Sequence, residues 1–597
     1  MKKFVVLCLV GLSILAFGAI GYAQQLYELE KGKMVSPLYT MQPSNFSEVV
    51  VGEKPPVLVF KASGMIDVIY EVNKNVPQLA PSPWSDWSGG TLLGVNRIFA
   101  PQSGLGLIAA GPLQGAPSGA AYNTKQSYWE TRARLRFDAL MGKQVSGTIF
   151  FEIDAARWGE RNGLGAQRNQ AGNWNADSAA VEVKNAFITF AVPPIIPVPI
   201  TVNAGILPWV TRPTVNYTDG TGVNVTFKPD PAQIKFTWMK ALENQDWASD
   251  DADVYGLEAK VNLGTVTAGG FISYYNMNTY PFQGSGSFNM YGFAAAPVGG
   301  NSAYNSNYII NNTANMSWWG LFADGKVGPV NISFDFDYDY GSVTAHGQTS
   351  LNNPILSERK VDYRGFLGRL GVDFPWEKFN FGVVGMYASG SDMQQTSPTG
   401  LPGTQVAYNT QGVNPGLFGY SRTVRGYIVP PNSEHVWDDE SLVIYGTGGN
   451  GLNRANTGYN NGGAAGGTVG RGAYGGTWFA KLYGNFKPTP WYRITLFGMY
   501  IGDTTKHGNT IGNAVTEAGY PRDDKSIGWE VDLINDIQIY KNLQLRFGGG
   551  YLFAGKAFDY RDQRVGAGAP FFTPATSRDN VSPSNPWAIA TKLIYVF

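Results

Sequence analysis

Residues that could carry out chemistry are sparse in this sequence. The stretch from Gly446 to Gly451 matches G-x-G-x-x-G and follows an apolar run, Leu442 to Tyr445. A dinucleotide site needs a helix directly after its glycines, but the residues that follow, LNRANTGYNNGGAAGG, are not a helical sequence. We therefore interpret this stretch as a surface loop that binds no cofactor.

Acidic and histidine side chains do not form a metal site or a catalytic triad either. One loop contains a group of aspartates, Asp246, Asp250, Asp251 and Asp253. They lack the spacing, the glycine and the terminal glutamate of an EF-hand, so a solvated acidic loop is favoured over a calcium site. The histidines lie far apart in predicted loops, at His346, His435 and His507. The sequence therefore predicts a protein that is not an enzyme, and an outer-membrane lipase or protease is disfavoured.

Charge at every second residue is the clearest polar pattern. Arg132, Arg134 and Arg136 alternate with apolar residues over 128–141, and aspartates alternate with aromatic residues over 329–341, at Asp335, Asp337 and Asp339. A helix would place the three aspartates on different sides, whereas a strand places them on one face. Both stretches therefore predict strands with one charged and one apolar face.

The same rhythm recurs along the chain after residue 60. We count eighteen such segments, at 62–72, 128–141, 144–156, 180–191, 200–209, 221–228, 232–243, 253–263, 265–276, 316–326, 329–341, 361–373, 378–389, 476–487, 490–501, 526–537, 541–554 and 587–597. Short turns containing glycine or proline alternate with longer polar connections. This asymmetry is typical of outer-membrane barrels, and an even number of strands leaves both termini on the short-turn side. Sixteen strands, with 200–209 and 221–228 in loops, is the structural alternative.

The composition agrees with a sheet whose two faces meet different surroundings. Charged residues make up 15% of the chain, Lys+Arg and Asp+Glu are 45 each, and Gly is 75. Soluble domains typically contain about a quarter charged residues. The mean hydropathy of −0.16 argues against a helical membrane protein, and the neutral balance excludes a basic nucleic-acid binder.

The first 23 residues have the pattern of a secretory signal peptide. Lys2 and Lys3 precede an apolar run from Phe4 to Ile20, and a small residue, Ala23, ends the stretch. Removing residues 1–23 leaves 574 of 597 residues and removes the single cysteine, Cys8. The mature chain then has no disulfide, no cysteine-based zinc site and no C-x-x-C-H haem attachment.

Aromatic residues gather at the ends of the predicted strands. Six tryptophans fall at the long-loop ends, at Trp129, Trp158, Trp209, Trp478, Trp529 and Trp587, and other rings lie at the turns, at Trp376, Trp491, Tyr492 and Tyr540. Two such girdles anchor a barrel at the two membrane interfaces. A membrane barrel is therefore favoured over a soluble β-sandwich or β-helix.

The C-terminal residues 587–597, WAIATKLIYVF, alternate and end on an aromatic residue. Leu593, Tyr595 and Phe597 resemble the terminal-strand signal read by the Gram-negative barrel-assembly machinery. Residues 60–72, FKASGMIDVIYEV, resemble the first strand of many porins. Over nearly its whole mature length the chain resembles a large outer-membrane porin.

This resemblance implies an all-β transmembrane barrel over 61–597, after a periplasmic N-terminal segment at 24–60. It implies passive diffusion of small hydrophilic solutes or ions across the outer membrane, contact with outer-membrane lipid, and a homotrimer without cofactor, metal or nucleic acid. A structural or interaction barrel, such as an adhesin or a sheath for a periplasmic partner, is the alternative. The channel and the structural barrel share the same fold, so they differ in whether the lumen is open to solutes.

Two sets of charged residues are the candidates for the pore lining: Arg132, Arg134, Arg136, Glu152 and Asp154 on the first hairpin, and Asp335, Asp337 and Asp339 half a circumference away. A three-residue turn at 142–144 would place Arg134 opposite Glu152. The aspartates have few partners in the neighbouring segments, mainly Arg364, so we expect weak cation preference. Because the loop 210–220 is short, a constriction is expected from the long loops 73–127 or 390–475.

Overall fold

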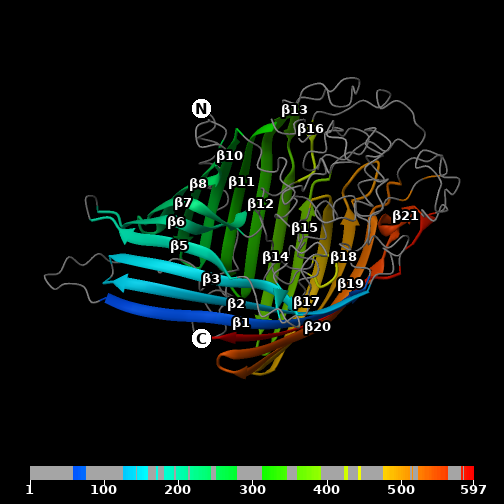
Figure 1. Cartoon of the computed structure of the whole chain (residues 1–597). Helices are drawn as coiled ribbons and strands as arrows, with labels where there is room; N and C mark the ends of the chain where they lie inside the picture. The colour runs from blue at the N-terminus through cyan, green and yellow to red at the C-terminus, as the bar shows by residue number, and fades with distance from the viewer. Residues whose placement is uncertain are drawn as a thin grey trace, which may run out of the picture.

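The computed structural model describes residues 58–74, 125–142, 144–158, 170–171, 181–193, 197–212, 216–243, 251–278, 312–345, 360–390, 423–427, 441–445, 475–510, 514, 516, 522–561, 580–582 and 584–597. Within these ranges the chain is a closed antiparallel β-barrel (Figure 1). No helix in the described ranges is long and apolar enough to cross a membrane.

Eighteen strands form the ring. In ring order they are β1 (Leu58–Lys74), β2 (Lys125–Met141), β3 (Val145–Trp158), β5 (Glu182–Ala191), β6 (Ile200–Thr211), β7 (Asn216–Phe227), β8 (Ala232–Leu242), β9 (Ala252–Leu263), β10 (Val266–Met277), β11 (Asn312–Val327), β12 (Val330–Ala345), β14 (Phe366–Trp376), β15 (Phe379–Ala388), β17 (Thr477–Thr489), β18 (Tyr492–Asp503), β19 (Ser526–Tyr540), β20 (Leu543–Ala554) and β23 (Trp587–Val596). The last strand closes the ring on the first, from Met65↔Val596 to Lys74↔Trp587.

Five short strands lie outside this ring order. β13 (Lys360–Tyr363) pairs with the long-loop end of β12. The others have two residues each: β4 (Gln170–Ala171), β16 (Thr423–Val424), β21 (Tyr560–Arg561) and β22 (Asn580–Val581). Each of the eighteen predicted segments coincides with one ring strand, so the prediction of eighteen strands is confirmed and the sixteen-strand alternative is wrong.

The short connections follow from glycine at the tight turns. Gly142, Gly264 and Gly328 have φ values of 59°, 72° and 58°, a left-handed conformation that glycine adopts without a steric cost. These turns lie on the same rim as Leu58 and Phe597, the two ends of the described ring. The start of β1 and the C-terminal residue therefore both lie on the short-turn side, while residues 1–57 lie outside the described ranges.

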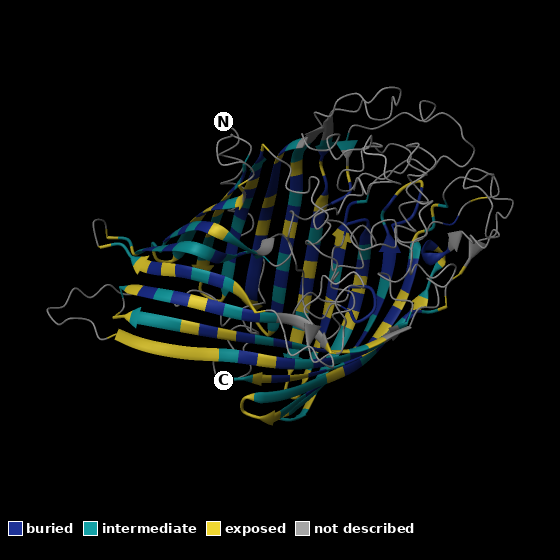
Figure 2. Cartoon of the chain, viewed as in Figure 1, coloured by how far each residue is buried: buried dark blue, intermediate teal, exposed yellow. Residues whose placement is uncertain are grey.

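Buried and exposed residues alternate along the strands of the wall (Figure 2). On β2, Leu135 and Phe137 are 40% and 47% exposed, whereas Arg134 between them is 4% exposed. The exposed face is the outside of the ring, so the arginines point inward. Closure also pairs the backbone groups that an open sheet edge would leave unpaired in hydrocarbon. An apolar outer belt around a polar interior is the arrangement of a barrel that crosses a membrane.

Candidate functional site

The first hairpin has the register that its charge pattern predicts. Met141 pairs with Val145 across a three-residue turn, and Arg134 lies opposite Glu152. The pairing shifts between Thr131 and Ala133, which removes Arg132 from the regular ladder. The predicted three-residue turn and the opposition of Arg134 and Glu152 are therefore confirmed.

Glu152 is the shared counter-ion of three cations inside the barrel. Its Oε1 lies 2.7 Å from Arg134 Nη2 and 3.2 Å from Arg132 Nε, and its Oε2 lies 2.8 Å from Lys184 Nζ. The Glu152 side chain is 1% exposed. Lys184, on the neighbouring strand β5, escaped the sequence analysis because a bulge in the β3–β5 pairing interrupts its alternation.

Arg136, the third arginine of the ladder, has a described partner on its own strand. Arg136 forms an ion pair at 2.9 Å with Asp138 on its own strand. The side chain of Asp154 lies outside the described residues. The buried Arg132, Arg134, Arg136 and Glu152 all lie on the inner face of this hairpin, as the sequence analysis placed them.

The aspartate ladder points inward from β12, and Asp335, Asp337 and Asp339 are all buried. β2 and β12 are the second and eleventh strands of the ring, so the two charged ladders lie on opposite sides of the barrel. The expectation that Arg364 is the main local partner is wrong. Arg364 lies 5.8 Å over the exposed ring of Tyr340, whereas the buried Arg369 is opposite Asp335 in the sheet.

The tip of the β6–β7 hairpin leaves the barrel wall and enters the lumen. β5 pairs with β6 only as far as Ile206, and β8 pairs with β7 only from Thr221 onward. Residues 207–211 and 216–220 pair only with each other. Figure 1 shows the end of β6 curling into the middle of the barrel. The sequence analysis looked for a constriction in 73–127 or 390–475 and not in this short loop, but the hairpin that carries it enters the lumen as well.

Two facing glycines allow the hairpin to bend. Gly205 and Gly222 are cross-strand partners at the point where the wall pairing ends. Gly205 has φ +136°, and a Cβ there would collide with the carbonyl oxygen of Ala186. A Cβ on Gly222 would collide with the carbonyl oxygen of Trp238. Only glycine fits both positions, so this pair of glycines determines where the hairpin bends. The pair could not be recognised from the sequence, because the two residues become partners only once the strand register is known.

An apolar cluster inside the barrel holds the tip against the wall. Trp209 is buried and stacks on Tyr275 at 5.9 Å between ring centroids. Leu207 beside it is also buried, and the wall contributes Met239, Val254, Phe271, Met277, Met316 and Trp318 to the same cluster. The predicted place of Trp209 in the outer aromatic girdle is therefore wrong, because this ring packs inside.

The long connection 390–475 also sends two described segments inward, as the sequence analysis expected for this loop. In the first, residues 423–427, the amide of Tyr427 donates to the carbonyl of Ser389 at 2.9 Å. Tyr427 is buried near the aspartate ladder. Burial, together with the negative charges of Asp337, Asp339 and Asp335, raises the pKa of the Tyr427 phenol well above its usual value. The other expected loop, 73–127, lies almost entirely outside the described residues.

The second inward segment, residues 441–445, is fixed by two carboxylates of β19. The amide of Leu442 donates to Asp532 Oδ2 at 2.6 Å, and the amide of Val443 donates to Glu530 Oε1 at 2.7 Å. The side chains of Leu442 to Tyr445 are all buried. The apolar run that resembled a strand before G-x-G-x-x-G is therefore an internal segment of the barrel, while 446–451 lie outside the described residues.

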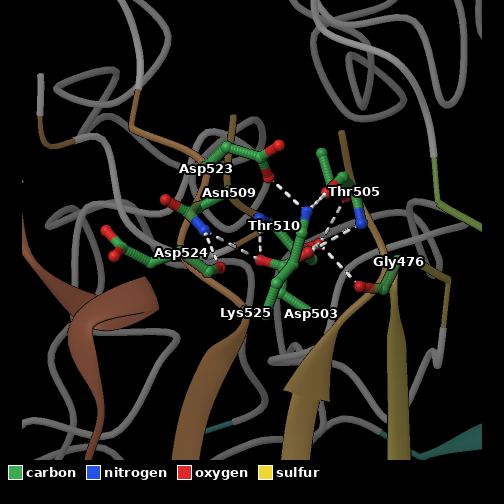
Figure 3. Close-up of polar contacts among 8 residues, drawn as sticks. All are labelled: Gly476, Asp503, Thr505, Asn509, Thr510, Asp523, Asp524 and Lys525. Atoms are coloured by element: carbon green, nitrogen blue, oxygen red, sulfur yellow. Dashed lines mark hydrogen bonds and ion pairs between the residues drawn. The ribbon is translucent and has the colours of Figure 1, made fainter. Parts of the chain in front are cut away.

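The long-loop ends of β17, β18 and β19 are joined by a polar cluster around Asp503 (Figure 3). Asp503 Oδ1 accepts from the Thr505 amide at 2.8 Å and Oδ2 accepts from the Thr510 amide at 2.6 Å. The Thr510 hydroxyl also lies 2.8 Å from the Gly476 carbonyl, and Asn509 Nδ2 donates to the Asp524 carbonyl at 2.5 Å. The loop after β18 is therefore folded back onto its own strand end.

The remaining polar candidates from the sequence have ordinary surroundings where they are described. Asp251 forms an ion pair with Lys240 at 2.5 Å, and Asp253 accepts from the Trp238 indole at 3.1 Å. His507 lies in the folded loop after β18. Asp246, Asp250, His346 and His435 lie outside the described residues. In the described part of the chain no three metal-ligating side chains come together.

Comparisons with known proteins identify similar structures but no family. No family model matches the chain, and no curated protein matches it. Among solved structures, Pseudomonas aeruginosa OccK11 (OpdR) has a TM-score of 0.41 and 10% identity, covering 90% of this chain and 96% of that one. P. aeruginosa OccK8 (OprE) has a TM-score of 0.41, 9% identity and coverage of 90% and 98%. Acinetobacter baumannii OccAB4 has a TM-score of 0.39 and 8% identity, covering 90% of this chain and 98% of that one.

Proposed function

We propose that this protein is a Gram-negative outer-membrane channel for passive diffusion of small hydrophilic solutes or ions. The observation that carries the proposal is a closed barrel with an apolar outside and a charged inside. Rings of this strand number enclose an aqueous channel. Three inward segments narrow the space within this one: the described part of the hairpin tip (207–212 and 216–220), residues 423–427 and residues 441–445. Such a channel needs no catalytic group, and we propose none.

We further propose that the two opposed ladders line the path of the solute. In planar bilayers under a KCl gradient, Asp335, Asp337 and Asp339 changed together to Asn should move the reversal potential toward anion preference. Changing Arg132, Arg134 and Arg136 together to Gln should move it toward cation preference. Both shifts should shrink at molar salt, where the Debye length falls to about 3 Å. Steady currents with no shift from either set would refute the lining, and no current from the unaltered protein would refute the channel.

The partners follow from the proposed location. Residues 1–23 would direct export, and 24–60 would lie on the periplasmic side, although β1 already begins at Leu58. The barrel-assembly machinery would insert the chain, and outer-membrane lipid would surround most of the apolar belt. Each of these assignments depends on the barrel residing in the outer membrane.

We propose that the protein forms a homotrimer, because the barrel wall is unusually short along the membrane normal at β6 and β7. At β7 only residues 221–227 pair with the wall. At the usual rise per residue and strand tilt, they span about 18 Å along the barrel axis. The apolar band of a membrane barrel is about 25 Å tall, so the wall is too low in this sector. The outer side chains here are Val202, Ala204, Val223 and Val225. The neighbouring strands β5 and β8 instead carry exposed rings such as Phe190 and Trp238. A protein neighbour would cover this sector. Light scattering in detergent that finds one chain per particle would contradict the trimer.

A further inference from the structure

Arg212 connects the inward hairpin tip to a distant part of the wall. It follows the last residue of β6, and its Nε donates to Asp335 Oδ1 at 2.6 Å while its Nη1 donates to Asp324 Oδ2 at 2.7 Å. Asp324 and Asp335 lie on β11 and β12, which pair side by side. The guanidinium carbon is 4.6 Å from the centre of the Phe322 ring. One side chain from the tip therefore bridges two carboxylates and covers an aromatic face.

The backbone at Arg212 is arranged for this contact. Its φ is +41°, a left-handed conformation that costs energy in any residue other than glycine. Such strain persists only where surrounding contacts over-determine it. The two ion pairs and the ring contact are the described interactions that hold the residue there.

The charge on Arg212 is permanent under all relevant conditions. Burial by itself would lower the pKa of the guanidinium, but the carboxylates of Asp335 and Asp324 raise it above its usual value. The side chains of Arg212, Asp324 and Asp335 are 18%, 9% and 2% exposed. Mostly buried ion pairs are screened less by salt than exposed ones, so this contact should persist at physiological ionic strength.

Beyond Ile206 and Thr221, the described residues of the tip have no backbone pairing to the wall. Its root is held by the apolar contacts of Leu207 and Trp209 and by Asp219, which pairs with Lys184 at 3.0 Å and accepts from Asn185 at 2.7 Å on β5. Lys235 of β8 also donates to the Val210 carbonyl at 3.4 Å. The described ion pairs and ring contact that reach the distant part of the wall, on β11 and β12, are those of Arg212.

We infer that Arg212 is a latch that seats the hairpin tip across the lumen and so sets both the width and the ion preference of the channel. The inference rests on the proposed channel function. It assigns a role in ion specificity to Arg212, which lies on neither β2 nor β12, the strands that carry the two charged ladders.

Two variants separate the latch from a simple effect of charge. R212Q removes the cation and leaves two carboxylates, whereas D324N/D335N removes the carboxylates and leaves the cation. Both should release the Arg212 end of the tip from β11 and β12, while the contacts at its root remain, and so raise single-channel conductance. The ratio of time at the larger to the smaller conductance should rise roughly tenfold or more, as expected for a lost hydrogen bond between charged groups. Their reversal potentials should shift in opposite directions, toward cations for R212Q and toward anions for D324N/D335N.

The controls use the unaltered full chain, R212K and R364Q. R212K retains the charge but not the fork geometry, so it should lie between the unaltered protein and R212Q. R364Q removes an arginine that stacks on an exposed ring, so conductance should stay unchanged. Heat-modifiable migration in gels confirms that each variant has assembled. Opposite shifts in reversal potential without any change in conductance would overturn the latch, as would unchanged behaviour in both variants. A silent unaltered protein would instead overturn the channel itself.

Discussion

Deleting Phe597, or replacing it by serine, is expected to leave the protein exported but largely unassembled. Phe597 lies at the seam where the barrel closes: the Gly64 amide donates to its carbonyl at 2.7 Å, and its amide donates to the Gly64 carbonyl at 3.0 Å. Its ring stacks on Tyr595 at 5.5 Å, and both rings face outward beside Leu593. The expected measurement is a loss of most of the heat-modifiable barrel from outer-membrane fractions.

A matched control distinguishes an effect specific to the barrel seam from the general effect of removing an outward-facing aromatic side chain. Phe381 on β15 is 46% exposed and far from the seam in the ring order, so Phe381→Ser should retain most of the assembled protein. Equal amounts of assembled barrel from the Phe597 variant and the unaltered chain would refute the proposed assembly role of Leu593, Tyr595 and Phe597.

Replacing Glu152 by glutamine is expected to destabilise the barrel strongly and to make the channel prefer anions. The change leaves Arg132, Arg134 and Lys184 without the carboxylate that they share. Removing one partner from a buried ion pair typically costs about 3–5 kcal/mol. The temperature at which the heat-modifiable form is lost should therefore fall, and the reversal potential in a KCl gradient should move toward anions.

Two further variants make this result specific. Glu258 pairs with Lys235 at 3.4 Å between partly exposed side chains, so Glu258→Gln should cost no more than about 1 kcal/mol. The double variant R134Q/E152Q removes one of the three cations together with the carboxylate and should recover part of the lost stability. A Glu152 variant as stable as the Glu258 variant would contradict the shared counter-ion.

The sequence was sufficient to predict the wall because barrel strands carry a local signal. Alternation of Asp335, Asp337 and Asp339 with aromatic residues requires a strand with two different faces, whatever lies around it. The register of the first hairpin was predictable for the same reason, since the parity of Arg134 and Glu152 constrains the turn. Both features depend on residues close together in the chain.

The interior was not predictable because its contacts join residues far apart. Leu207, Trp209 and Thr211 continue the alternation of β6, so the sequence alone predicts that they belong to the wall. Only the β5–β6 and β7–β8 pairing shows that they lie beyond it. Nothing near Arg212 indicates partners more than a hundred residues away. Likewise, the burial of Leu442 depends on carboxylates of β19. Predicted partners such as Arg364 were near in sequence but on the wrong face.

The central claim is that water and ions pass through the lumen despite the three inward segments. The direct test is current through the purified, heat-modifiable protein in a planar bilayer at low voltage. We predict discrete steps whose size increases with KCl concentration, as for a permanently open aqueous pore. Assembled barrels that insert without any steps would contradict the channel and favour the alternative, a plugged barrel with a structural or interaction role.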